Sequence, residues 1–105
     1  MSHLEESLAL QIKAAGLPVP VREYAAIPDR RFRFDFAWPD RALLLECQGG
    51  VFIRGGHSTG VGITKDAEKA SLAAVHGYRL ILVTAAHVKG GMAVKWITEA
   101  LWNSK

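Results

Sequence analysis

The chain has 105 residues, a formal net charge of +3 and a pI of about 9.3, and half of its residues are apolar. We expect one domain spanning residues 1–105, and this composition excludes an intrinsically disordered chain. No apolar run approaches the roughly 20 residues of a membrane span, and no signal peptide is recognisable. We therefore expect a cytoplasmic protein whose basic charge permits a polyanionic partner.

The N-terminal segment is predicted to form a helix. Ser2 and Glu5 have the spacing of a capping box, and apolar residues follow at helical intervals as far as Ala15. Gly16 is placed to end this helix. Residues 19–27 are then predicted to form a strand.

A hairpin is predicted next, with two carboxylates side by side. Residues 32–38 alternate in polarity, residues 42–48 form a second strand, and a two-residue turn is expected at Asp40-Arg41. In this register Asp35 lies opposite Glu46. One face is then wholly apolar, with the pairs Trp38/Leu43, Phe36/Leu45 and Phe34/Cys47. The other face is polar and carries Arg33, Asp35, Glu46 and Gln48.

The carboxylate pair at Asp35 and Glu46 is the most informative feature of the sequence. Directly opposite residues have Cβ atoms roughly 4.5–5.5 Å apart, and like charges there repel. A bound divalent cation such as Mg²⁺, which prefers oxygen ligands, would turn this repulsion into attraction. The alternative is a longer or bulged turn that moves the two carboxylates apart.

The second half of the chain is predicted to contain a loop, two helices and a strand. Six of the ten glycines fall within the loop at 49–62. A helix is expected from a cap at Thr64 to Gly77, then a buried strand at 78–84 and an amphipathic helix at 92–102. The order α-β-β-β-α-β-α predicts an antiparallel hairpin joined to a parallel crossover, and hence a mixed sheet.

These residues resemble the PD-(D/E)xK nuclease superfamily, with Asp35 as its first acid and Glu46 as its second. Within it, the chain looks like small endonuclease-like proteins of phages and prophages, which are relatives of very-short-patch-repair endonucleases and Holliday-junction resolvases. The stretches that carry the resemblance are 15–18, 21–24, 32–39, 55–57 and 66–69. The resemblance implies an α/β fold with a restriction-endonuclease-like α-β-β-β-α-β core, whose mixed sheet is flanked by helices.

The resemblance also implies an activity. We expect a DNA endonuclease that hydrolyses phosphodiester bonds with Mg²⁺ or Mn²⁺, acts as a homodimer, and is structure-selective in repair or recombination. If the protein is phage-encoded, it would work in the cytoplasm of a bacterial host. Two alternatives remain open: a nuclease-fold module that binds nucleic acid with weakened turnover, and a purely structural accessory protein.

The metal ligands implied by the resemblance are Asp35 and Glu46. The backbone carbonyl of Cys47 is a third candidate, because it follows Glu46 and carbonyl oxygens bind Mg²⁺. Glu6 is a candidate outer-shell acid, or it compensates the helix macrodipole. The Cys47 thiol itself is expected to fill core space.

The chain departs from the superfamily pattern two residues after Glu46, where Gln48 occupies the position of the expected lysine. An amide can hydrogen-bond a water but carries no charge. Lys69 is the candidate replacement, and its alternative is an ordinary solvated helix lysine.

The glycine-rich loop and the basic residues are expected to contact the nucleic acid. His57 is a candidate general base or acid, or a surface residue. Arg31, Arg33 and Arg54, together with His57, are the expected nucleic-acid contacts.

Overall fold

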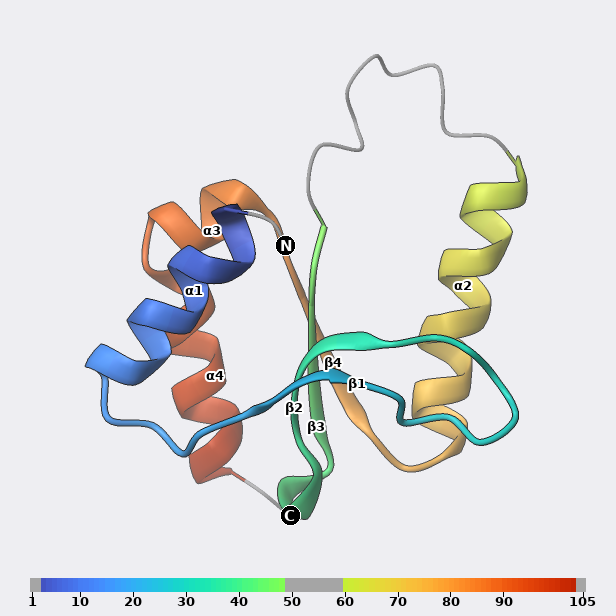
Figure 1. Cartoon of the computed structure of the whole chain (residues 1–105), viewed down its shortest axis with the longest axis horizontal. Coiled ribbons are helices and arrows are strands. Elements are labelled where there is room, and N and C mark those ends of the chain that lie inside the picture. The colour runs from blue at the N-terminus through green and yellow to red at the C-terminus, as the bar shows by residue number, and fades with distance from the viewer. Residues whose placement is uncertain (1–2, 49–59, 104–105) are drawn as a thin grey trace.

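The computed structural model describes residues 3–48 and 60–103, which form a mixed sheet with helices on both faces (Figure 1). The helices are α1 (His3–Ala14), α2 (Gly60–Val75), α3 (Ala85–Lys89) and α4 (Met92–Trp102). The strands are β1 (Val21–Tyr24), β2 (Phe34–Trp38), β3 (Leu43–Cys47) and β4 (Arg79–Val83). The order in the sheet is β1-β2-β3-β4, and only the β3–β4 pair is parallel. The predicted α/β fold with a mixed sheet is confirmed.

Each face of the sheet has its own apolar cluster. Helices α1, α3 and α4 cover one face, and α2 lies alone against the other (Figure 1). The first cluster contains Phe36 and Trp38, and the second contains Ala37 and Leu44. Burial at every fourth position directs α4 inward, through Ala93, Ile97 and Leu101.

The turn between β2 and β3 differs from the prediction, although the register agrees. Phe36 pairs with Leu45 and Trp38 with Leu43, as predicted. The connection is not a two-residue turn at Asp40-Arg41, however, but a 3₁₀ turn over Pro39–Arg41 closed by Ala42 with φ of 50°. Proline has no N–H and could not serve as a paired residue closing a two-residue hairpin, whereas its fixed φ suits the first position of a helical turn.

The predicted apolar face is wrong at Phe34. Phe34 belongs to the cluster under α2, whereas Phe36 lies under α1. The strict alternation of β2 therefore breaks at Asp35. In the ladder between β1 and β2, the pairs Arg22–Phe36 and Tyr24–Phe34 flank Glu23 and Asp35. Glu23 has a φ of 50°, so the ladder is irregular between these two pairs.

Several element boundaries also differ. Of the predicted residues 19–27, only β1 forms a strand, and it begins after Pro20, which cannot donate to a ladder. Helix α2 starts at Gly60, inside the predicted loop, rather than after Thr64. Helix α3 was not predicted, because five residues are too few to show a helical period. The capping residue Ser2 lies outside the described residues.

No helix among the described residues is long and apolar enough to cross a membrane.

Candidate active site

Asp35 and Glu46 lie where β2 begins and β3 ends, and each carboxylate binds a backbone amide of the opposite strand. The Cys47 N–H donates to Asp35 Oδ2 at 2.7 Å, and the Asp35 N–H donates to Glu46 Oε1 at 3.3 Å. The ladder between β2 and β3 is last seen at Phe36 and Leu45, and beyond it these two side-chain hydrogen bonds connect Asp35 with Glu46 and Cys47. A carboxylate has about four lone-pair sites, so these bonds orient both groups and leave other lone pairs for a ligand.

Lys69 reaches this site from α2. Its Nζ donates to Glu46 Oε2 at 2.7 Å and to the Arg33 carbonyl at 2.7 Å, and it lies 4.7 Å from the centre of the Phe34 ring. The helical phase explains this placement. Lys69 precedes Ala73, which is buried against the sheet, by four residues, so both lie on the same side of α2. The lysine is therefore an ordered partner of Glu46 rather than a solvated side chain.

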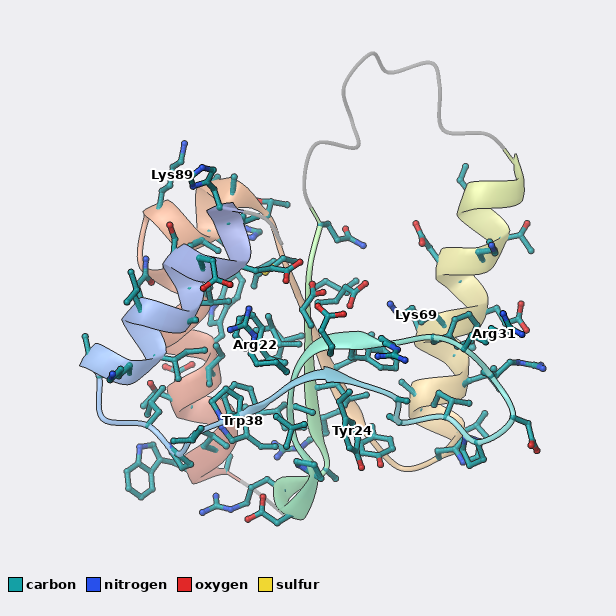
Figure 2. All side chains as sticks on the ribbon, in the orientation of Figure 1. Arg22, Tyr24, Arg31, Trp38, Lys69 and Lys89 are labelled. Atoms are coloured by element: carbon teal, nitrogen blue, oxygen red, sulfur yellow. The ribbon has the colours of Figure 1, made fainter. Side chains whose placement is uncertain are left out.

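A second group of acids lies next to Asp35 on the α1 side. Carboxylate oxygens of Glu5, Glu23 and Asp35 all lie within 4.8 Å of one another, and we call these three residues the acidic cluster. Figure 2 shows carboxylates gathered between α1 and the central strands, near Arg22. All three could contribute oxygen ligands to a hard cation.

The structure brings Glu5, not Glu6, to the acidic cluster. Glu6 is half exposed and forms an ion pair with Arg22 at 3.0 Å. The sequence did contain a signal that separates the two. Glu5 precedes the buried residue Leu8 by three positions and so shares its side of the helix, whereas Glu6 is rotated away.

The environment raises the pKa of two of these acids. Burial, followed by the negative charges of Asp35 and Glu23, raises the pKa of Glu5 above its ordinary value of 4.5. Burial also raises the pKa of Glu46 above 4.5, against the opposing effect of its hydrogen bond with Lys69. Without a cation, the folded protein therefore disfavours the charged form of these groups.

The raised pKa of Glu5 predicts a pH-dependent stability difference. The stability associated with protonated Glu5 is fully present below its unfolded-state pKa and is lost as the pH rises through the raised folded-state pKa. In metal-free protein, Glu5→Gln should therefore gain melting temperature relative to the wild type as the pH rises above the ordinary value of 4.5. We expect less than about 4 °C, the shift that 1 kcal/mol produces in a domain of this size. Thermal melts in EDTA across this pH range measure it.

The matched control is the neighbouring Glu6→Gln, which removes an exposed ion pair instead. Its melting temperature should not rise relative to the wild type over the same range. Equal behaviour of the two variants would show that the acidic cluster does not strain the metal-free fold.

Cys47 is the last residue of β3, and Gln48 follows it. The Gln48 N–H donates to the Val83 carbonyl at 2.7 Å, and Gln48 lines a groove of about 340 Å³ together with Glu46 and Lys69. Burial and the nearby carboxylates raise the pKa of Cys47 to about 12. This thiol is therefore protonated at neutral pH, which is consistent with a packing role and not with a nucleophile.

Two of the four predicted nucleic-acid contacts, Arg31 and Arg33, are among the described residues. Arg31 and Arg33 are exposed in the segment that precedes β2, and Figure 2 shows Arg31 beside α2. The Arg33 carbonyl is the group that accepts from Lys69. Arg54 and His57 lie outside the described residues.

Comparison with known proteins supports the fold. No family model matches the chain, and no curated protein sequence matches it. The solved structure of the catalytic domain of the homing endonuclease I-Bth0305I is similar over 97% of this chain and 95% of that chain, with a TM-score of 0.69 and 17% sequence identity. The chain therefore has the nuclease-like α/β fold of that domain.

Proposed function

We propose that the protein is a metal-dependent endodeoxyribonuclease of the PD-(D/E)xK type. The observation that carries this proposal is the contact of Lys69 with Glu46 beside Asp35. This contact places two carboxylates and one ammonium group together at the open end of the β2–β3 hairpin, although the lysine comes from a helix and not from the strand. The similarity to an endonuclease catalytic domain supports the same assignment.

The residues present fit a hard divalent cation such as Mg²⁺ or Mn²⁺. Every candidate ligand is an oxygen, and the repulsion and burial that raise the pKa of Glu5 and Glu46 would be relieved by a positive ion. Asp35 and Glu46 would hold it, with the Cys47 carbonyl as a further ligand and Glu5 as the additional acid in place of Glu6. Such an ion neutralises charge on a phosphodiester and promotes ionisation of water.

The chain's own residues then have separate tasks. Lys69 Nζ, fixed between Glu46 and the Arg33 carbonyl, holds a positive charge where negative charge builds up on the phosphate. The backbone amides that bind Asp35 and Glu46 keep both carboxylates oriented. The Gln48 amide, in the groove beside Glu46, can hydrogen-bond the attacking water.

The substrate in this proposal is DNA, and two copies of the chain would cut two strands. Arg31, Arg33 and Arg54 are the proposed contacts to phosphates, and His57 the proposed proton donor or acceptor. Structure-selective cleavage in repair or recombination is the finer form of the same proposal. Its rival is a module that binds nucleic acid without turnover.

The test is incubation of the purified protein with supercoiled, linear, mismatched and branched DNA and with RNA, in Mg²⁺, Mn²⁺, Ca²⁺ or EDTA. We expect DNA cleavage in Mg²⁺ or Mn²⁺ and none in EDTA. Tight binding without cleavage in any metal would favour the rival, and neither binding nor cleavage would contradict both proposals. Sedimentation of the protein with and without DNA tests the homodimer.

A further inference from the structure

Arg22 is the basic side chain that the structure places beside the acidic cluster. It belongs to β1 and pairs across the ladder with Phe36, and its guanidinium carbon lies 4.6 Å from the centre of the Phe36 ring (Figure 2). Its side chain is about one-third exposed, so it is accessible from solvent and still anchored by the ring. Stacking on an aromatic ring suits the planar guanidinium and holds it in place.

The guanidinium contacts two acids of α1. Arg22 Nη2 lies 3.0 Å from Glu6 Oε2 and 3.9 Å from Glu5 Oε1. Glu5 is a member of the acidic cluster, whereas Glu6 is not. Arg22 therefore partly neutralises the cluster from its edge. The Nε of Arg22 is buried and has no hydrogen-bond partner among the described residues, so not every N–H donor of the guanidinium is used.

We propose that Arg22 is an exchangeable counterion that links metal binding to DNA binding. This inference rests on the proposed function. In the metal-free protein Arg22 compensates the acidic cluster. A divalent cation takes over that compensation, and the guanidinium then binds a phosphate of the DNA backbone while it stays on the Phe36 ring.

The charges predict the direction in which Arg22 changes the affinity for the metal ion. A guanidinium and a divalent cation repel each other, so Arg22 weakens metal binding even though it lies at the metal site. The same repulsion favours a bound phosphate between or beside the two positive charges, and an arginine fork matches phosphate oxygens. A purely structural arginine would do the opposite on removal, because a disordered site would bind metal less well.

The experiment compares the wild type with Arg22→Gln and Arg22→Lys in two measurements. The first is Mn²⁺ affinity by calorimetry without DNA. Arg22→Gln should bind Mn²⁺ about threefold or more tightly, the scale of one charge repelling a divalent ion through solvent. Arg22→Lys, which keeps the charge, should stay close to the wild type.

The second measurement is the salt dependence of DNA binding. In Ca²⁺, Arg22→Gln should weaken binding equally across sequences and reduce the slope of log affinity against log salt by about one, as loss of one phosphate contact does. In EDTA the slope should not change, because the acids hold Arg22 there.

Two variants control for the loss of a positive charge. Arg30→Gln breaks an ion pair of similar length, 3.1 Å to Glu68, on the α2 side, and should leave Mn²⁺ affinity unchanged. Lys95→Gln, at an exposed position of α4, should leave the salt slope unchanged. Weaker or unchanged Mn²⁺ binding in Arg22→Gln, or an unchanged salt slope in Ca²⁺, would overturn the inference about Arg22 but not the proposed function. A wild type that binds no Mn²⁺ would overturn the proposed function itself.

Discussion

Neutralising either carboxylate of the hairpin should nearly abolish DNA cleavage. For Asp35→Asn and Glu46→Gln we expect the rate in Mg²⁺ to fall by roughly 10²–10³-fold or more, the scale of losing one group that stabilises developing charge. Asp35→Asn is the sharper of the two. Its amide oxygen can still accept the Cys47 N–H that Asp35 binds at 2.7 Å, so the change removes charge and leaves the strand contact in place. Single-turnover cleavage assays measure the effect.

The same variant should separate metal binding from folding. Asp35→Asn should keep a folded far-UV circular dichroism spectrum, but Mg²⁺ or Mn²⁺ should raise its melting temperature less than that of the wild type. The matched control is Asp40→Asn, an exposed aspartate in the 3₁₀ turn at the other end of the hairpin, which should cleave normally. Wild-type rates in both Asp35→Asn and Glu46→Gln would remove the hairpin from the site.

Truncating Lys69 should also cost a large part of the rate. Lys69→Ala removes the ammonium that lies 2.7 Å from Glu46 Oε2, and we expect cleavage to slow by about 10²-fold. DNA affinity measured in Ca²⁺ should fall much less, because the lysine is proposed to act on the reacting phosphate. Adding Gln48→Lys should restore part of the rate, since position 48 lines the same groove as Glu46 and Lys69.

Lys65→Ala provides the comparison for this prediction. Lys65 lies one turn before Lys69 on α2 and is exposed, so its loss removes equal charge without touching Glu46. Lys65→Ala should therefore cleave like the wild type. If Lys69→Ala did so too, Gln48 or the metal alone would have to position the attacking water.

The hairpin register could be predicted from the sequence because burial fixes it. Leu43, Leu44 and Leu45 are all buried, but shifting one strand by one residue would place Glu46 on the face that buries Phe36 and Trp38, so burial of that face favours one pairing. The position of Phe34 could not be predicted in this way. Its side depends on the irregular ladder at Glu23, and a positive φ at a glutamate leaves no pattern in composition or spacing.

The placement of the site residues was also only partly predictable from the sequence. Lys69 and Glu5 each share a helix side with a buried residue, so the helical phase indicates their placement and would have favoured Glu5 over the predicted Glu6. The helical phase does not predict how close a side chain comes to its partner on the sheet. The approach of Lys69 to Glu46 requires α2 to pack beside β4, the edge strand next to β3, and this depends on contacts between segments far apart in the chain. Arg22 was not predicted for the same reason, since its partners come from α1 and β2.

The source of the lysine has a consequence for how such proteins are recognised. A motif that places an acid and a lysine two residues apart on one strand is a rule about linear order. The reaction, however, depends only on a positive charge within reach of the acid. In the site proposed for this chain, that charge comes from α2, which begins at Gly60, thirteen residues after the last residue of β3, so a sequence pattern would miss it. A template of interatomic distances, with the lysine free to come from any element, would retain this chain and others whose charge has moved to a new place in the sequence.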